Sequence, residues 1–491
     1  MGRDRAERLK AAADRLVVVA NRLPVTVAKQ EQEWTVRPGS GGLVTALAPV
    51  LRNRNGLWCG WSGTTEEEEA PLEGLFGEAE KQAGFRLLPV TLSKEEVELF
   101  YLGFSNETLW PLFHDLLGRT HFEKTYWESY LKANQRYAST LSGAIDSASP
   151  IWVHDYHLIP LGGRLREGGH IGRIGFFLHI PFPTSDLFRR LPWRRQLIEF
   201  FLAYDLVGFQ TRRDFANFIH CVREMLPDVQ IFPGSSHYTI LLRGRRILVQ
   251  HFPISIDFQE FNRLAKFPST QEAAAIFQDK YPDQKIILGL DRLDYTKGVV
   301  PRFRAFQTCL KKYPDLRGKV VLVQVVVPSR IEVPEYQAMK RELEQLLAQI
   351  NGEFTRPGWV PIHYFFRSLS RLELAAMYRA ADIALVTPIR DGMNLVSKEY
   401  CASSPDGGVL ILSEFAGAAE QLREGAILVN PFDLDGVADA IYGAFHMPME
   451  EQLRRMNHLR NHLRQKNVYE WVNGFLAALQ EGQVPAASRS A

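Results

Sequence analysis

The chain has few cysteines and no long apolar run, and each shortage excludes a class of protein. Its 491 residues contain four cysteines, and none of them has the paired spacing of a zinc site or a disulfide-rich module. We therefore expect Cys59, Cys221, Cys309 and Cys401 to be buried thiols in a reducing compartment. No segment approaches the roughly 18 apolar residues of a membrane span. The apolar run at residues 16–20 is too short for a secretory signal, so we expect a soluble cytoplasmic protein.

An excess of one charge is also missing. The formal net charge is +2, from 58 Lys and Arg against 56 Asp and Glu. This balance argues against a large basic surface for nucleic acid. A chain of this length exceeds one ordinary hydrophobic core, so two domains are expected. Neither a GxxxxGK[ST] loop nor a complete GxGxxG fingerprint occurs.

Short runs rich in Val, Ile and Leu alternate with helical patterns such as 336–350 and 371–382. Ten runs are predicted strands: 16–21, 151–155, 175–181, 206–210, 247–254, 285–290, 319–328, 383–388, 408–415 and 426–431. Continuous apolar strands between helices indicate parallel sheets that are covered on both faces. Ten of them fit two doubly wound α/β sheets better than one. The polar span 256–284 is the expected boundary.

Polar side chains follow several of these strands. Doubly wound sheets bind ligands at the carboxyl ends of their strands. Arg292 and Lys297 follow the strand at 285–290, and a planar fork beside a mobile point charge suits phosphate oxygens. The alternative is a surface turn in which these cations form salt bridges with Asp291 or Asp294.

Two helix entries could also meet an anion or a sugar. Gly42 ends a glycine-rich turn before an apolar helix, where backbone amides can approach a phosphate. In IRDGMNLVSKEY (389–400), Asn394 is a good N-cap, Asp391 lies just ahead, and Glu399 falls in the first or second turn. The alternative is a simple cap with one exposed acid.

The segment WVHDYHLIP (152–160) could suggest a metal, because His154 and His157 flank Asp155. No third ligand cluster is evident, so a carboxylate that binds sugar hydroxyls fits better. His179 is either a satisfied core histidine or a site residue. In the aromatic stretch 100–114, Tyr101 and Trp110 belong either to the core or to a surface that stacks on sugars.

Together these motifs resemble one family, the trehalose-6-phosphate synthases of glycosyltransferase family 20. The ordered segments that carry the resemblance are GSGGLVTAL, GLWCGWSG, FSNETLWPLFH, WVHDYHLIP, IGFFLHIPFP, GFQT, LDRLDYTKG, VPSR, RDGMNLVSKEY and SEFAGAA. The resemblance implies a GT-B fold, with two Rossmann-like doubly wound parallel-sheet domains facing across a catalytic cleft. Residues 1–255 would bind the acceptor and residues 256–466 the nucleotide sugar. Within 467–491, a helix would cross back to the first domain and precede a disordered tail.

The resemblance also implies a reaction, the retaining transfer of glucose from UDP-glucose, or another nucleotide-glucose, to glucose 6-phosphate. The implied catalytic residues are Asp155, His179, Arg292 and Lys297. The implied donor-binding residues are Gly42, Arg292, Lys297, Asp391, Gly392, Met393, Asn394, Leu395, Val396 and Glu399. The implied acceptor-binding residues are Arg22, Trp61, Tyr101, Trp110, Asp155 and Arg330. No metal and no cofactor are expected. A homodimer or homotetramer is expected, with a separate phosphatase acting on the product.

Several alternatives stay open at this point. A related glucosylglycerol-phosphate synthase would use glycerol 3-phosphate as the acceptor, although GSGGLV, Tyr101 and Trp110 look like the trehalose type. A non-catalytic regulatory homologue would be expected to have lost part of the catalytic set, which is present in full. Front-face transfer is favoured over a covalent intermediate on Asp155. The donor nucleotide could be UDP, GDP or ADP.

Overall fold

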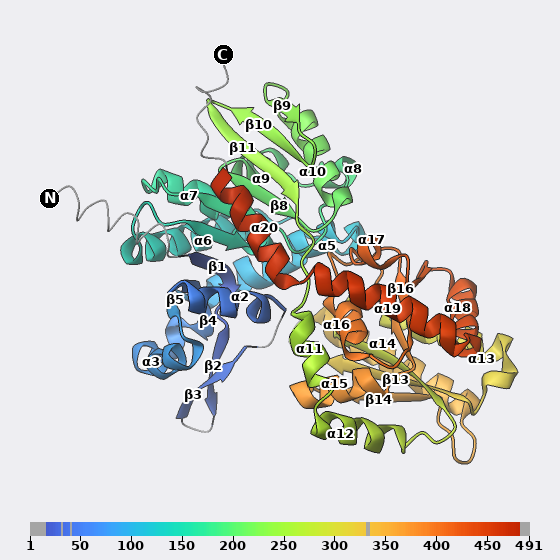
Figure 1. Cartoon of the computed structure of the whole chain (residues 1–491). Coiled ribbons are helices and arrows are strands. Elements are labelled where there is room, and N and C mark those ends of the chain that lie inside the picture. The colour runs from blue at the N-terminus through green and yellow to red at the C-terminus, as the bar shows by residue number, and fades with distance from the viewer. Residues whose placement is uncertain (1–15, 31–32, 40–41, 330–333, 482–491) are drawn as a thin grey trace. The chain divides into compact units, whose positions relative to one another are not determined.

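The computed structural model describes residues 16–30, 33–39, 42–329 and 334–481 (Figure 1). The chain divides into two compact units. The N-terminal unit comprises Met1–Pro253 together with Trp471–Ala491, and the C-terminal unit comprises Ile254–Glu470. The tail expected at the end of the chain lies outside the described residues.

The N-terminal unit is built on a nine-stranded sheet with the order β5-β4-β1-β6-β7-β8-β11-β10-β9. The strands are β1 (Val17–Arg22), β4 (Leu57–Thr65), β5 (Arg86–Leu92), β6 (Ile151–His154), β7 (Ile174–Phe177), β8 (Leu206–Phe209), β9 (Gln230–Pro233), β10 (His237–Leu242) and β11 (Arg245–His251). A separate hairpin pairs β2 (Val25–Gln30) with β3 (Glu33–Pro38). The pairs from β5 to β11 are parallel, whereas β11, β10 and β9 are antiparallel. The expectation of purely parallel sheets is therefore wrong at this edge, because two tight reversals build a ribbon there.

Helices and short turns accompany these strands. They are α2 (Gly42–Asn53), α3 (Leu72–Ala83), α4 (Lys94–Glu96), α5 (Trp110–Phe113), α6 (Lys124–Ala144), α7 (Leu161–Glu167), α8 (Ser185–Phe188), α9 (Arg194–Phe201), α10 (Arg212–Met225) and α20 (Val468–Glu481), with the π-helix η2 (Val97–Leu109) and the short turns η1 (Glu66–Glu68), η3 (Leu117–Arg119) and η4 (Tyr156–Leu158).

Helix α20, red in Figure 1, packs on the sheet of the N-terminal unit. The Phe475 ring stacks on Trp152 of β6, with centroids 4.2 Å apart. A Cβ atom on Gly175 would lie 2.7 Å from Phe475, and one on Gly208 would lie 2.8 Å from it. Only glycine at these two strand positions lets the helix approach so closely.

The C-terminal unit has a six-stranded, wholly parallel sheet with the order β14-β13-β12-β15-β16-β17. Its strands are β12 (Lys285–Arg292), β13 (Val320–Val327), β14 (Ile362–Phe366), β15 (Ile383–Val386), β16 (Val409–Ser413) and β17 (Ile427–Val429). Its helices are α11 (Phe258–Leu264), α12 (Pro268–Gln278), α13 (Val299–Lys312), α14 (Pro334–Phe354), α15 (Arg371–Ala380), α16 (Leu395–Ser403), α17 (Ala419–Leu422), α18 (Leu434–His446) and α19 (Met449–Gln465), with the turns η5 (Tyr295–Lys297) and η6 (Pro314–Leu316).

All ten predicted strands are present, and so are the two predicted sheets. The strand β13 is buried at almost every position, as expected for a strand with both faces covered. The prediction missed β4, β5, β14 and both antiparallel ribbons. These strands mix glycine, proline or polar residues with apolar ones, as in LWCGWSGTT and RLLPVTL. None of the described helices is long and apolar enough to cross a membrane.

Candidate active site

A buried ion pair fixes the carboxyl end of β12 in the C-terminal unit. Arg302 of α13 is 1% exposed and donates to the Asp291 carboxylate, so the pair has almost no access to water. The same guanidinium donates to Gln324 Oε1 at 3.0 Å and to Thr387 Oγ1 at 2.9 Å. Its Nη2 donates to the Lys297 carbonyl at 3.2 Å. Arg302 therefore ties β12, β13, the residue that follows β15 and the turn that carries Lys297 into one network.

The turn after β12 is shaped by its own side chains. Asp294 Oδ1 accepts from the Thr296 amide at 2.9 Å and from the Thr296 hydroxyl at 2.8 Å. Gly298 has φ 66°, and a Cβ there would lie 2.3 Å from the Thr387 carbonyl oxygen. Arg292 is exposed, and Lys297 is half-buried. The alternative in which Asp291 forms a salt bridge with Arg292 or Lys297 is wrong, because Asp291 forms its ion pair with Arg302.

Lys297 instead contacts a carboxylate from a distant part of the sequence. Its Nζ lies 2.6 Å from Asp391 Oδ2, and both side chains are largely shielded from water. The Asn394 amide donates to the same oxygen at 3.2 Å, while Asn394 Oδ1 accepts from the Ser397 amide at 3.0 Å. The predicted N-cap is thus confirmed. The site places a cation, a carboxylate and the positive end of α16 together.

The predicted donor residues around this helix entry lie close in sequence but differ in burial. Gly392 and Met393 are buried, and Leu395 and Val396 are half-buried. Glu399 lies in the second turn of α16 and accepts from the Tyr378 hydroxyl at 2.8 Å. Burial raises the pKa of Glu399, and the hydrogen bond from Tyr378 opposes that shift. The alternative of an exposed acid is wrong, because this carboxylate is half-buried.

Lys398, the neighbour of Glu399, was missed by the sequence reasoning. Its Nζ is buried and donates to the Ile254 carbonyl and to Gln421 Oε1, each at 2.6 Å. Burial lowers the pKa of Lys398 to about 7. A lysine next to a glutamate in the sequence is usually an exposed, solvated pair. Nothing in the sequence therefore indicates that Lys398 is buried.

In the N-terminal unit, Arg22 at the end of β1 is held by aromatic rings. Its guanidinium lies 4.0 Å from the centroid of Trp61 and 5.4 Å from that of Tyr101. The Trp61 indole donates to the Thr64 carbonyl at 2.6 Å, which fixes the ring. Gly63 has φ 97°, and a Cβ there would lie 2.8 Å from Arg22 Nη1. The structure brings Arg22, Trp61 and Tyr101 together, as the predicted acceptor set requires.

Trp110 lies deeper in the same unit. It is 5% exposed, and its ring lies 4.2 Å from that of His114 and 5.7 Å from that of Tyr156. Its predicted contact with the acceptor stays a prediction. Arg330 lies outside the described residues, and Gly42 is described as the first residue of α2.

Asp155 and His179 meet at the carboxyl ends of β6 and β7. Asp155 has φ 75°, an uncommon value for a residue other than glycine, and its Oδ1 accepts from the His179 amide at 3.1 Å. His179 Nε2 lies 3.1 Å from His154 Nδ1, and Gln210 Nε2 lies 3.4 Å from His179 Nδ1. Burial lowers the pKa of His179 to about 3 and that of His154 well below its ordinary value. Both imidazoles are therefore neutral near pH 7.

The two histidines of HDYH diverge. His154 faces His179, whereas His157 stacks on Tyr101 with centroids 5.9 Å apart. Within the described part of the chain, no group of three or more His, Cys, Asp or Glu side chains could hold a metal ion.

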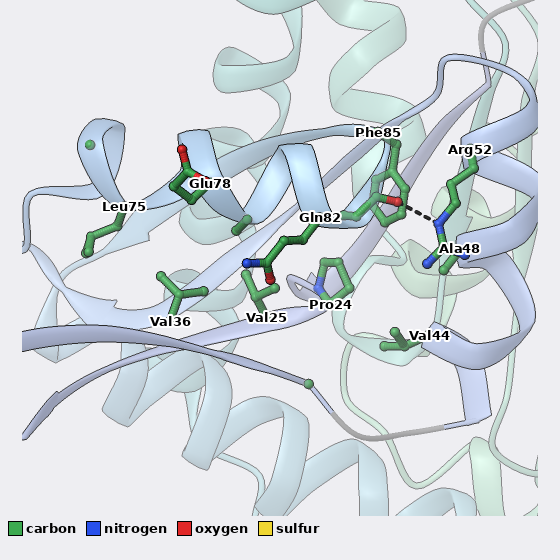
Figure 2. Close-up of a pocket in the computed structure, with 14 residues that line it drawn as sticks. Pro24, Val25, Val36, Val44, Ala48, Arg52, Leu75, Glu78, Gln82 and Phe85 are labelled. Atoms are coloured by element: carbon green, nitrogen blue, oxygen red, sulfur yellow. Dashed lines mark hydrogen bonds between the residues drawn. The ribbon is translucent and has the colours of Figure 1, made fainter.

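A cavity of about 530 Å³ lies elsewhere in the N-terminal unit, beside the β2–β3 hairpin, α2 and α3 (Figure 2). Its lining is largely apolar and includes Val25, Val36 and Leu75. Arg52 Nε donates to the Ala83 carbonyl at 2.7 Å, drawn as a dashed line in Figure 2. None of the predicted site residues lines this cavity, so it is separate from the groups described above.

Comparisons with known proteins give the chain its relatives. The family model described as Glycosyltransferase family 20 matches residues 14–481. A bifunctional trehalose-6-phosphate synthase/phosphatase from Thermoproteus tenax is 43% identical over 477 residues, which cover 95% of this chain and 63% of that relative. A trehalose-6-phosphate synthase from Mycobacterium sp. (strain JLS) is 41% identical over 97% of this chain and 98% of its own length.

A solved structure is similar along nearly the whole chain. It is a UDP-forming α,α-trehalose-phosphate synthase from Burkholderia xenovorans in complex with glucose 6-phosphate. The sequence identity is 36%, the TM-score is 0.85, and the match covers 95% of this chain and 100% of that one. The GT-B prediction is confirmed by this likeness. The structure of this chain is thus similar to that of a protein that binds a phosphosugar.

Proposed function

Because the chain belongs to glycosyltransferase family 20, we propose that it transfers glucose from UDP-glucose to glucose 6-phosphate with retention. The products are α,α-trehalose 6-phosphate and UDP. Among the residues of this chain, the contact between Lys297 and Asp391 supports the proposal most directly. Lys297 Nζ lies 2.6 Å from Asp391 Oδ2 at the carboxyl end of β12, so a cation suited to phosphate adjoins a carboxylate suited to sugar hydroxyls.

The donor is assigned to the C-terminal unit. When the bond between the sugar and the diphosphate breaks, negative charge grows on the diphosphate. Arg292 and Lys297 stabilise that charge, and fixed charge of this kind is often the largest catalytic contribution. Asp391 accepts hydrogen bonds from hydroxyls of the transferred glucose, and Glu399 accepts from the ribose. Backbone amides of residues 392–396 complete the donor set of this unit, and the role of Gly42, which belongs to the N-terminal unit, stays a prediction from family resemblance.

The acceptor is assigned to Arg22 and its aromatic neighbours. A guanidinium stacked on Trp61 presents its planar fork in a fixed orientation, which suits the phosphate of glucose 6-phosphate. Tyr101 supplies a hydroxyl beside this fork. Trp110 and Arg330 are assigned to the same subsite by family resemblance.

The step itself is a front-face displacement. The bond between the anomeric carbon and the diphosphate oxygen breaks, and the acceptor hydroxyl oxygen bonds to the same face of that carbon. The released phosphate oxygen takes the proton of the acceptor hydroxyl, so no protein base is required. Asp155 orients sugar hydroxyls, and the neutral imidazole of His179 adjoins the transferred glucose.

The test is release of nucleoside diphosphate from UDP-, GDP- and ADP-glucose, with glucose 6-phosphate or glycerol 3-phosphate as the acceptor. We expect turnover with UDP-glucose and glucose 6-phosphate. Strong turnover with glycerol 3-phosphate and none with glucose 6-phosphate would overturn the proposed acceptor. Product anomers resolved by NMR would test retention separately.

We also propose a cellular compartment, an oligomeric state and a partner enzyme for the protein. The four cysteines are buried free thiols, which suits a reducing compartment such as the cytoplasm. A homodimer or homotetramer is proposed from family habit, and light scattering of the purified chain measures it. A separate phosphatase would convert the phosphorylated product to the free disaccharide.

A further inference from the structure

A cavity lined by arginines lies at the amino ends of strands in the N-terminal sheet. Arg173 directly precedes β7, Asp205 directly precedes β8, and Arg245 is the first residue of β11, so all three lie at the amino ends of parallel strands. Arg22 and Asp155 lie at the carboxyl ends of β1 and β6, which run in the same direction. The cavity is therefore distant from the proposed acceptor subsite within the same unit.

The arginines of this cavity converge on one carboxylate. Arg166 Nη2 lies 2.6 Å from Asp205 Oδ2, while Arg173 Nη1 and Arg245 Nη2 lie 3.8 and 3.6 Å from Asp205 Oδ1. The Ile174 amide also donates to Asp205 Oδ2, at 2.8 Å. Three guanidiniums thus share a single acid among the side chains that line the cavity.

Backbone carbonyls hold two of these guanidiniums in place. Arg166 Nη1 donates to the carbonyls of His170 and Gly172, each at 2.8 Å. Arg245 donates to the carbonyls of residues 202 and 203 at 3.1 and 2.8 Å. Cations fixed in this way are already oriented, so little side-chain entropy is lost when an anion binds.

The charge balance of the lining favours an anion. Three arginines against one aspartate leave a formal charge of +2 among the lining side chains, with His170 counted as neutral. Burial lowers the pKa of Arg166, the charge of Asp205 opposes that shift, and the like charges of Arg245 and Arg173 add to it. Burial and Arg166 also lower the pKa of His170, which supports the neutral form. An anion in the cavity would relieve this repulsion.

We propose that this cavity, of about 610 Å³ and lined by Arg166, Arg173, Arg245, Asp205 and His170, binds the phosphate group of a small phosphorylated molecule. The side chains of Arg173 and Arg245 are 30% and 40% exposed, so a ligand can reach both. Planar guanidinium forks match phosphate oxygens in geometry and charge. The site is independent of the proposed transfer reaction.

The test measures bound phosphate by equilibrium dialysis of the full chain with labelled inorganic phosphate at constant ionic strength. Arg173→Gln is compared with wild type and with Arg195→Gln, which removes an exposed arginine paired with Glu199 in its own helix. We expect wild type and Arg195→Gln to bind one more phosphate per chain than Arg173→Gln, or to bind it about tenfold more tightly. Phosphate bound in the active site is common to all three proteins and cancels.

A second variant and a vesicle-binding assay complete the test. If Arg173→Gln fails to fold, Arg173→Lys keeps the charge and loses the fork, and its phosphate affinity is still expected to fall. Flotation with phosphatidylglycerol vesicles separates a lipid headgroup from a free phosphate. Equal stoichiometry and affinity in wild type and the Arg173 variant would overturn the proposal. Binding to vesicles without binding of free phosphate would overturn it as well.

Discussion

The two units hold their proposed phosphate-binding cations by different means. In the C-terminal unit, Lys297 lies against the Asp391 carboxylate, and its turn is tied to the buried Arg302–Asp291 pair. In the N-terminal unit, Arg22 lies over the faces of Trp61 and Tyr101. A ring face carries no full charge, so it orients the cation without neutralising it. A carboxylate neutralises the cation as well, so an incoming diphosphate has to share Lys297 with Asp391.

The largest effect is expected when the buried cation of the C-terminal unit is removed. Arg302→Met leaves Asp291 buried without its ionic partner, and we expect the free energy of unfolding to fall by about 3–5 kcal/mol. Urea unfolding followed by circular dichroism measures it. Arg304→Ala on the same helix is the control, because its 3.5 Å contact with Glu342 is exposed and contributes about 0–1 kcal/mol. Equal stability of the two variants would contradict the account of this network.

The next largest effect is expected at the exposed donor cation. Arg292→Ala removes charge from the proposed diphosphate site, and kcat should fall about 10²–10³-fold. Because the side chain is exposed, the melting temperature should stay within about a degree or two of wild type. Steady-state kinetics and a thermal scan give both values. Lys311→Ala, an exposed lysine of α13, should leave both unchanged. A folded Arg292→Ala protein with near-normal turnover would mean that Arg292 does not stabilise the diphosphate.

A smaller effect is expected from a conservative substitution of Arg22 in the N-terminal unit. Arg22→Lys keeps the charge and loses the planar fork over Trp61, so KM for glucose 6-phosphate should rise about tenfold. KM for the nucleotide sugar should not change, because Arg22 is assigned to the acceptor alone. Kinetics with each substrate varied in turn separate the two constants. A rise confined to the donor KM would mean that Arg22 serves the other substrate.

The last expected effect is a dependence of stability on pH in the C-terminal unit. Burial lowers the pKa of Lys398 to about 7, below the ordinary value of 10.5 that applies in the unfolded chain. Between these values the unfolded state binds more protons, so the contribution of Lys398 to stability increases with pH, by at most about 1.4 kcal/mol per pH unit. Urea unfolding of wild type and Lys398→Met at pH 7, 8 and 9 measures the difference. A difference independent of pH would mean that Lys398 keeps its proton in the fold.

The sequence predicted the parts of the fold that depend on local pattern. Strands covered on both faces, such as β12 and β13, are continuous apolar runs and could be recognised without any partner. Strands such as β4 and β5 mix glycine, proline and tryptophan with polar residues, so their pairing depends on neighbours far along the chain.

The candidate site also has a part that could be predicted from the sequence and a part that could not. Polar residues after strands could be predicted because the carboxyl ends of parallel strands share one edge. Their partners could not, since Lys297 meets a carboxylate 94 residues away. Arg302 reads as one more arginine in a basic helix, and nothing in the sequence marks it as the buried partner of Asp291. The roles of the site residues toward substrate remain predictions.

The position of α20 has a consequence for synthesis on the ribosome. Trp471 lies 6.1 Å from the His179 ring and 6.3 Å from that of His154, centroid to centroid, and Phe475 covers Trp152. These rings belong to the core of the N-terminal unit, yet they are translated after the entire C-terminal unit. The part of the first sheet that α20 covers therefore stays uncovered until more than two hundred further residues have been translated. The unit that begins first is completed last.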